Sequence, residues 1–114
     1  MNLSVIILTQ NEALVIKDCL ESIHNLADEI IIVDSGSTDA TVNIAQSFHA
    51  TVIAGSGDYA ALRNLGLKAA SSDWIFYLDA DERLTPALRQ KISEIISQRP
   101  KTNNQRPLSY KLNR

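Results

Sequence analysis

The chain has 114 residues, of which 45% are hydrophobic and 21% charged, and its formal net charge is −2. This composition is ordinary for one globular domain and lacks the basic excess that nucleic-acid-binding proteins usually show, so no nucleic-acid partner is expected. The single cysteine, Cys19, has no partner for an internal disulfide, which suits a reducing compartment.

Four short apolar runs have the composition of buried β-strands. They are rich in β-branched and aromatic residues, and each is followed by polar or glycine-rich residues. The runs are residues 3–8 (LSVIIL), 29–33 (EIIIV), 50–54 (ATVIA) and 74–78 (WIFYL).

A segment with the apolar spacing of a helix follows each of these runs. The second helix is expected to begin after an N-cap at Ser37 or Asp39, and the fourth after the cap Thr85, with Pro86 at the first helical position. The apolar positions are Ile16, Cys19, Leu20 and Ile23; Thr41, Ile44, Ala45 and Phe48; Leu62, Leu65, Gly66 and Ala69; and Leu88, Ile92, Ile95 and Ile96.

The alternating order of strands and helices predicts an α/β fold with three layers, α/β/α. The strands are too apolar to have a solvated face, which indicates a mainly parallel sheet covered by helices on both sides. From about Arg99 the sequence is polar and interrupted by proline. We therefore expect one domain over residues 1–98, and a polar tail or the start of a further half over residues 99–114. Within this tail, residues 108–112 (LSYKL) would suit the start of another strand.

Polar residues are concentrated where the four predicted strands end. In an open parallel sheet, ligands bind beyond the carboxyl ends of the strands. Three of the four ends carry a carboxylate, and this convergence predicts a ligand site at that edge. The residues are Thr9, Gln10, Asn11 and Glu12; Asp34, Ser35, Gly36 and Ser37; Gly55, Ser56 and Gly57; and Asp79, Ala80 and Asp81.

Asp79 and Asp81 flank the small Ala80 directly after the fourth buried strand. In an extended segment, residues i and i+2 point to the same side, so both carboxylates would face one point. Mg²⁺ and Mn²⁺ take one or two protein carboxylates and complete their shell with water and substrate phosphates. This pair therefore indicates a metal site, with a solvated acidic turn as the alternative.

Asp34 and Arg63 are weaker candidates when each is taken alone. An aspartate after a strand is usually a turn or cap residue, although Gly36 in the loop DSGSTD would let a ligand approach the backbone. Arg63 follows the glycine-rich end of the third strand, where a guanidinium can pair bidentately with a diphosphate. A solvated surface arginine is the alternative. Cys19 lies on the apolar stripe of its helix and is interpreted as a packing residue.

Together these motifs resemble family 2 glycosyltransferases of the Rossmann-like GT-A fold, which transfer a sugar from a nucleotide-sugar donor. The resemblance extends to about residue 98 and rests on SVIILTQNEA, ADEIIIVDSGSTDAT and YAALRNLGLKAASSDWIFYLDADERL. The combined pattern is most similar to the bacterial branch that adds sugars to the lipopolysaccharide core.

The resemblance implies a role for each matching residue. Thr9 and Glu12 would lie beside the nucleotide, Asp34 would meet the uracil edge, and Arg63 would lie near the base or the diphosphate. Asp79 and Asp81 match the DxD motif, whose acids reach the ribose and bind Mg²⁺ or Mn²⁺; the metal would neutralise the leaving diphosphate. The residues implied in nucleotide-sugar binding are Thr9, Glu12, Asp34, Ser35, Gly36, Arg63, Asp79, Ala80 and Asp81.

The implied reaction is inverting, metal-assisted transfer from a nucleotide-diphosphate sugar, with a UDP-sugar favoured, to a glycan, lipid-linked saccharide or lipopolysaccharide-core acceptor. Nothing after Arg83 matches the half of the family that binds the acceptor and supplies the general base. The chain is therefore expected to bind the donor without transferring sugar, and its open sheet edge favours self-association.

Two alternatives remain open from the sequence. One is a catalytically silent nucleotide-binding module, and the other is a receiver-like α/β signalling domain. Receiver domains keep an acidic pair after the first strand, where this sequence has TQNE.

The sequence predicts a cytoplasmic chain. No apolar stretch approaches the ~20 residues of a membrane-spanning helix, and the start MNLSVIILTQNE lacks the basic region and cleavage site of a signal peptide. Peripheral association with the inner face of the membrane stays open.

Overall fold

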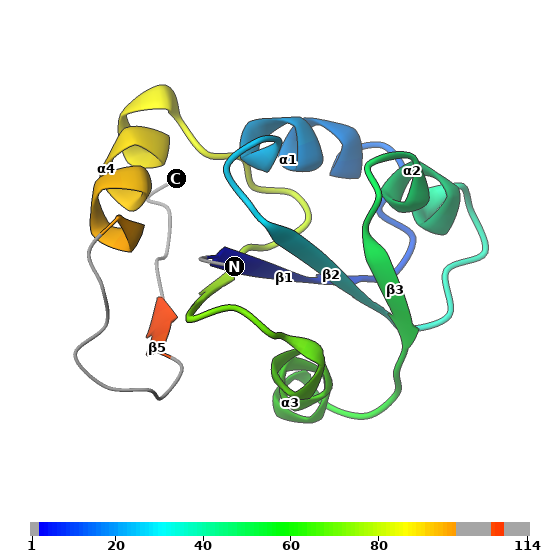
Figure 1. The fold of residues 1–114 in the computed structure, drawn as a ribbon. Helices are drawn as coiled ribbons and strands as arrows, with labels where there is room; N and C mark the ends of the chain where they lie inside the picture. The colour runs from blue at the N-terminus through cyan, green and yellow to red at the C-terminus, as the bar shows by residue number, and fades with distance from the viewer. Residues whose placement is uncertain (1–2, 98–105, 109–114) are drawn as a thin grey trace.

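An open parallel sheet forms the centre of the molecule, and helices cover both of its faces (Figure 1). The computed structural model describes residues 3–97 and 106–108. Its five strands lie in the order β3-β2-β1-β4-β5, and all neighbours are parallel. The strands are β1 (Leu3–Thr9), β2 (Glu29–Asp34), β3 (Thr51–Ala54), β4 (Trp74–Tyr77) and β5 (Arg106–Leu108).

Three helices cover one face of the sheet and one helix covers the other (Figure 1). This arrangement confirms the predicted three-layer α/β/α fold with a mainly parallel sheet. The first face carries α1 (Ile16–Ile23), α2 (Thr41–Ser47) and α4 (Pro86–Ile96), and the second carries α3 (Tyr59–Ala69).

Successive side chains of β1 point into two different cores, as the pleat of a strand requires. Val5 and Ile7 pack in the cluster beneath α1, α2 and α4, whereas Ile6 packs with Leu65 beneath α3. All three β1 side chains are at most 1% exposed. Because both faces are covered, the strand is an unbroken apolar run instead of an alternating one.

The start of α2 differs from the prediction. The helix begins at Thr41, and its N-cap is Ala40, which offers no side-chain hydrogen bond, so the prediction of Ser37 or Asp39 as the N-cap is wrong. Asp39 nevertheless accepts a hydrogen bond from the N–H of Thr41 at 2.9 Å. The hydroxyl of Ser37 is used at the end of β2 instead.

The predicted start of α4 is confirmed, and this helix also holds the end of α1. The hydroxyl of Thr85 accepts a hydrogen bond from the N–H of Leu88 at 3.1 Å. One turn into α4, Arg89 donates to the carbonyl oxygens of Ser22 at 2.9 Å and His24 at 2.7 Å. A cation on the last carbonyls of a helix satisfies acceptors that have no partner inside the helix.

The fifth strand adds to the predicted set. It begins at Arg106 and pairs with β4, so that Trp74 lies opposite Arg106. The expected strand at residues 108–112 shares Leu108 with it, and residues 109–112 lie outside the described part of the chain.

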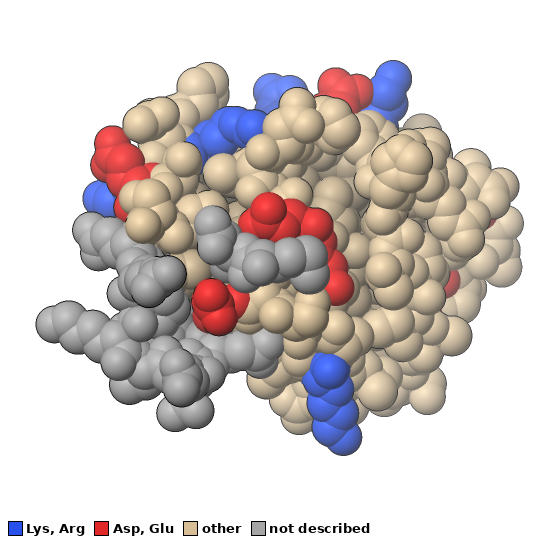
Figure 2. Space-filling view, in the orientation of Figure 1, with Lys and Arg blue, Asp and Glu red and all other residues tan. Residues whose placement is uncertain are grey.

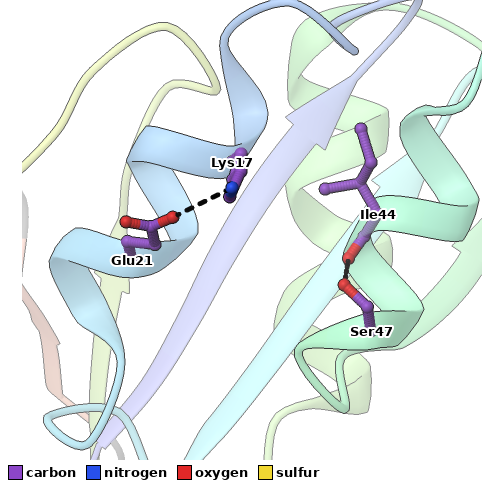
Figure 3. Close-up of polar contacts among 4 residues, drawn as sticks. All are labelled: Lys17, Glu21, Ile44 and Ser47. Carbon is purple, nitrogen blue, oxygen red and sulfur yellow. Dashed lines mark hydrogen bonds and ion pairs between the residues drawn. The ribbon is translucent and has the colours of Figure 1, made fainter.

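Exposed contacts on α1 and α2 are local (Figure 3). Lys17 and Glu21 form an ion pair of 3.7 Å one turn apart on α1, and Ser47 donates to the carbonyl of Ile44 at 2.5 Å on α2. Exposed pairs of this kind contribute about 0.2–0.5 kcal/mol. The outer helices are therefore held by their buried faces.

Within the described ranges, no helix has the length and apolar character needed to cross a membrane.

Gly66 lets α3 approach β1 closely, and we predict that Gly66→Ala destabilises the fold. A Cβ at this position would lie 2.5 Å from Cγ2 of the buried Ile6. Overpacking of a core costs about 1–3 kcal/mol, against about 1 kcal/mol gained from helix propensity, so the free energy of unfolding in urea should fall. In an Ile6→Ala background the same change should be neutral or stabilising. An equal loss in both backgrounds would contradict the steric explanation.

Candidate functional site

The carboxyl ends of β1, β2 and β4 bring three of the predicted clusters together at one edge of the sheet. Thr9, the last residue of β1, lies opposite Asp34, the last residue of β2. On the other side of β1, Tyr77 of β4 lies opposite Ile6, and Asp79 follows two residues later. The parallel register thus assembles acids that are far apart in the sequence.

Asp34 is a buried carboxylate whose oxygens are engaged within the protein. It is 6% exposed. Its Oδ1 accepts hydrogen bonds from the hydroxyls of Thr9 at 2.6 Å and Ser37 at 2.5 Å, and its Oδ2 accepts from the N–H of Ser37 at 2.8 Å. The carboxylate therefore fixes the end of β1 and the loop after β2 to one another.

These hydrogen bonds decide the charge of Asp34. Burial by itself raises the pKa of a carboxyl group, but the hydroxyls of Ser37 and Thr9 and the N–H groups of Ser37 and Gly36 lower the pKa of Asp34 below its ordinary value of 3.8. The residue is ionised at neutral pH. Its hydrogen bonds stabilise the fold above that ordinary value, and this contribution is lost as the pH falls through the lowered pKa.

The loops after β1 and β2 are joined by further hydrogen bonds. The N–H of Asn11 donates to the hydroxyl of Ser37 at 2.8 Å, and the Asn11 side chain accepts from the N–H of Thr38 at 2.8 Å. The N–H of the half-buried Glu12 donates to the hydroxyl of Thr41 at 2.8 Å. Asn11 adopts a left-handed backbone with φ 55°, which asparagine tolerates better than most residues. This linking role of Asn11 was not predicted from the sequence.

Ser35 and Gly36 form the turn that follows Asp34. The N–H of Ser35 donates to the carbonyl of Thr9 at 2.9 Å, which extends the parallel pairing beyond the strands. Gly36 has φ 81°, and a Cβ placed on it would meet nothing within 4 Å. The turn is therefore open at its tip, as the expectation of a close ligand approach requires.

We predict that Thr9→Val destabilises the chain in a pH-dependent way, because it removes one hydrogen bond from the buried Asp34 carboxylate. The expected loss at neutral pH is about 1–3 kcal/mol, measured by urea unfolding. The difference from the unmodified chain should shrink as the pH falls below 3.8 and through the lowered pKa of Asp34. Thr9→Ser keeps the hydroxyl and loses only a methyl group, so its smaller deficit of about 1 kcal/mol should not depend on pH. A pH-independent deficit in Thr9→Val would contradict the assignment.

The DxD segment is a tight turn. The N–H of Glu82 donates to the carbonyl of Asp79 at 2.9 Å, and the Glu82 carboxylate accepts from the N–H of Asp79 at 3.3 Å. Asp79 and Asp81 are exposed, whereas Ala80 is 4% exposed and belongs to the core. The assumption of an extended segment is thus wrong. The two acids still point away from the core because the residue between them is buried.

The turn therefore carries two exposed carboxylates, Asp79 and Asp81. Among the described residues, no three His, Cys, Asp or Glu side chains come together in a way that could hold a metal ion. Two exposed carboxylates fit a hard divalent cation that takes its remaining ligands from water and a bound phosphate group. They do not fit a structural metal, which needs a closed set of protein ligands.

Cys19 lies beneath the DxD turn. The thiol of Cys19 contacts the carbonyl oxygen of Asp79 at 3.6 Å and is 1% exposed. Burial, followed by the negative charges of Glu82, Asp81 and Asp79, raises the pKa of Cys19 from 9.0 to about 12. The thiol therefore stays protonated and supports the turn from within the core, in agreement with its predicted packing role.

We predict that Cys19 resists alkylation in the folded chain. At about pH 8 its thiolate fraction is lower by roughly 10³-fold than for a thiol with an ordinary pKa, and the group is also shielded from reagent. Iodoacetamide labelling, followed by intact-mass measurement, should be at least about a hundredfold slower for the folded chain in buffer with chelator than for the chain unfolded in concentrated urea. Since the chain contains one cysteine, one mass shift reports the result. Comparable rates in both conditions would contradict the buried placement.

Arg63 reaches this edge from the opposite layer of the sheet. Its guanidinium carbon lies 3.9 Å from the ring centroid of Tyr77, the last residue of β4, and 5.5 Å from that of Tyr59, the first residue of α3. The pKa of Tyr59 is raised by burial and then by the charge of Asp79, with a hydrogen bond to the Asp79 side chain adding to the shift and Arg63 opposing it. Arg63 and Asp79 are therefore neighbours of the same tyrosine.

Neither tyrosine was predicted from the sequence to lie near Arg63. Tyr59 precedes Arg63 by one helical turn, and Tyr77 precedes Asp79 by two residues. Spacing alone would have indicated that Tyr59 and Arg63 share a helix face. Their approach to Asp79 depends on α3 packing across the sheet, which no local pattern shows.

A cavity of about 390 Å³ opens at the other end of the sheet, where the strands begin. Its lining includes His24, Phe48 and His49, and the rings of His24 and Phe48 meet edge-on with centroids 6.1 Å apart. None of the predicted site residues lines it.

Figure 2 shows acidic side chains gathered in the middle of the face that it draws, with lysine and arginine side chains mainly towards the margin.

The three layers, the parallel sheet and the polar carboxyl edge define a GT-A type α/β domain. The model of the family described as glycosyl transferase family 2 matches residues 4–107. The chain therefore belongs to glycosyltransferase family 2, which confirms the family resemblance found in the sequence.

Relatives are found among bacterial glycosyltransferases. The chain is 38% identical over 111 residues to a glycosyltransferase of Rickettsia bellii, covering 96% of this chain and 37% of that protein. It is 38% identical over 104 residues to the lipopolysaccharide core biosynthesis glycosyltransferase LpsC of Rhizobium meliloti, covering 83% of this chain and 37% of LpsC. The chain thus spans less than two fifths of the length of these relatives.

Solved structures share the fold. The first 349 residues of S. aureus TarS match with a TM-score of 0.71 and 25% identity, over 85% of this chain and 32% of that one. Glucosyl-3-phosphoglycerate synthase from Mycobacterium tuberculosis, in complex with Mn²⁺ and UDP-glucose, matches with a TM-score of 0.63 and 29% identity, over 70% of this chain and 33% of that one.

Proposed function

We propose that the carboxyl edge of this chain binds a nucleotide-diphosphate sugar together with Mg²⁺ or Mn²⁺, as the donor-binding part of a glycosyltransferase. The observation that carries the proposal is the exposed pair Asp79 and Asp81 beside Arg63 and the ordered end of β2. Two carboxylates and one guanidinium suit a cation and a diphosphate in the same place. The structurally similar glucosyl-3-phosphoglycerate synthase with Mn²⁺ and UDP-glucose supports this ligand class, with a UDP-sugar favoured.

Different residues of the carboxyl edge would contact different parts of the ligand. Asp79 and Asp81 would hold the metal, and Arg63 the diphosphate. Ser35 and the backbone of Gly36 would contact the base or ribose, because the turn that they form is open at its tip. The Asp34 carboxylate is largely engaged, so we assign it to ordering this turn beside Thr9 in addition to any contact with the uracil edge. Glu12 would complete the wall of the site, whereas Ala80, which was expected to line it, packs in the core and would support the turn from beneath.

Transfer itself needs an acceptor hydroxyl held in position and deprotonated. When bound, Mg²⁺ or Mn²⁺ would offset the negative charge of the leaving diphosphate. Binding of a glycan or lipopolysaccharide-core acceptor, and the general base of an inverting reaction, are assigned to the part of the relatives that lies beyond the match. A lipopolysaccharide-core enzyme among the relatives supports this acceptor class.

We predict that UDP binds more tightly with Mn²⁺ than in chelator, measured by calorimetric titration of the chain. Asp81→Asn should remove most of this gain, because it replaces a charged oxygen ligand with a neutral amide. The expected change in affinity is about tenfold or more. Asp73→Asn is the matched control, since Asp73 is exposed and lies just before β4, at the opposite end of that strand. Equal affinity with and without metal in the unmodified chain would refute the metal role.

A further inference from the structure

The turn after β2, residues 35–38, is held in its second half by one residue of the loop after β1. The N–H of Asn11 donates to the hydroxyl of Ser37 at 2.8 Å. The side-chain oxygen of Asn11 accepts hydrogen bonds from the N–H of Thr38 at 2.8 Å and from the Thr38 hydroxyl at 3.3 Å. Asn11 therefore binds the turn through its backbone and through its side chain.

The first half of the same turn is fixed separately, at the end of β1. The N–H of Ser35 donates to the carbonyl of Thr9 at 2.9 Å, and the Asp34 carboxylate accepts from the Thr9 hydroxyl at 2.6 Å. Gly36 lies between the two fixed halves, and a Cβ placed on it would meet nothing within 4 Å. The turn is thus anchored on both sides while its tip stays open to a ligand.

Position 11 makes two demands that few residue types meet. Its backbone is left-handed, with φ 55°, a conformation that glycine, asparagine and aspartate adopt more readily than other residues. Its side chain must also carry an acceptor that reaches Thr38 in the neighbouring loop. Glycine meets only the first demand, whereas asparagine and aspartate meet both. The side chain is exposed, so packing in the core does not explain the choice of Asn11.

A turn that is already ordered binds a ligand more tightly than one that must become ordered on binding, because the ordering entropy opposes association. Under the proposed function, Ser35 and the backbone of Gly36 would contact the base or ribose. The metal and the diphosphate would instead meet Asp79, Asp81 and Arg63, which lie outside the turn. Order in the turn should therefore affect the nucleoside part of the ligand and not the diphosphate part.

We propose that Asn11 is a positioning residue for nucleoside recognition, whose side-chain oxygen holds the turn of residues 35–38 in the conformation that receives the base or ribose. This inference rests on the proposed function. It assigns to Asn11 an effect on one part of the ligand, which a general contribution to stability would not produce.

Three substitutions separate the side-chain oxygen from the backbone. Asn11→Gly removes the oxygen but keeps the left-handed backbone and the N–H that donates to Ser37. Asn11→Asp keeps an acceptor for Thr38. Asn25→Gly is the matched control, since Asn25 is also exposed and left-handed, with φ 66°, and precedes β2 at the opposite end of the sheet. Urea unfolding of each variant checks that the fold is kept.

The test is calorimetric titration of each chain with UDP and with inorganic pyrophosphate, both in the presence of Mn²⁺. Pyrophosphate reports the metal and diphosphate contacts without a nucleoside. Asn11→Gly should weaken UDP binding by about fivefold, as expected for the loss of an ordinary hydrogen bond, and leave pyrophosphate binding unchanged. Asn11→Asp should restore the ratio of the two affinities, because its added charge acts on both anions. Asn25→Gly should keep the ratio of the unmodified chain.

The outcomes separate this inference from its premise. If the unmodified chain binds UDP more tightly than pyrophosphate and Asn11→Gly leaves the ratio unchanged, the positioning role is overturned and the proposed function stands. A ratio that Asn11→Asp does not restore, or that Asn25→Gly lowers equally, also overturns it. If the unmodified chain binds UDP no more tightly than pyrophosphate, the turn makes no nucleoside contact and the inference fails, while the metal and diphosphate assignments stand. If it binds neither ligand, the proposed function fails and this inference fails with it.

Discussion

The hydrogen bonds around the buried Asp34 carboxylate are the constraint on which the arrangement of the candidate site depends. A buried anion is tolerated only where donors surround it, and here the donors come from the end of β1 and from the loop after β2. The same serine that donates to Asp34 accepts from Asn11 of the neighbouring loop. One carboxylate thus helps to order two loops, which are also joined by hydrogen bonds from Thr38 to Asn11 and from Glu12 to Thr41.

The carboxyl edge of the sheet has two parts, the hydrogen-bonded loops after β1 and β2 and the more exposed DxD turn after β4. The DxD turn is closed by a backbone hydrogen bond and rests on the core through Ala80 and Cys19, while its acids remain exposed. Close packing of α3 at Gly66 brings Tyr59 and Arg63 to the end of β4, where Arg63 contacts the ring of Tyr77. Under the proposed function, the ordered loops after β1 and β2 would hold the neutral base. The acids of the DxD turn and Arg63 would meet the metal and the anionic diphosphate.

The family and the geometry constrain function at different levels. Membership of glycosyltransferase family 2 follows from the match over residues 4–107 and defines a class of chemistry. The structure adds which side chains of the edge are exposed to solvent and which are buried and hydrogen-bonded within the protein. Asp34 is the clearest case. It was expected to contact the nucleotide base, but it is buried and its carboxylate accepts hydrogen bonds from within the protein. The role that the family motif implies for Asp34 is therefore extended by a structural one, because its hydrogen bonds order the loop.

The sequence by itself determined the fold class, the order of elements and the clustering of polar residues at strand ends, because these depend on local apolar periodicity and on the fixed handedness of parallel crossovers. It did not determine that Asn11 joins two loops, that the DxD segment is a turn, or that Arg63 packs against the rings of Tyr59 and Tyr77. The link made by Asn11 follows from the pairing of β1 with β2, the turn from hydrogen bonds between Asp79 and Glu82, and the contacts of Arg63 from how closely α3 packs on β1. Only the tertiary structure could decide them, because the approach of two packed layers is set by side-chain volumes that leave no periodic signal in the sequence.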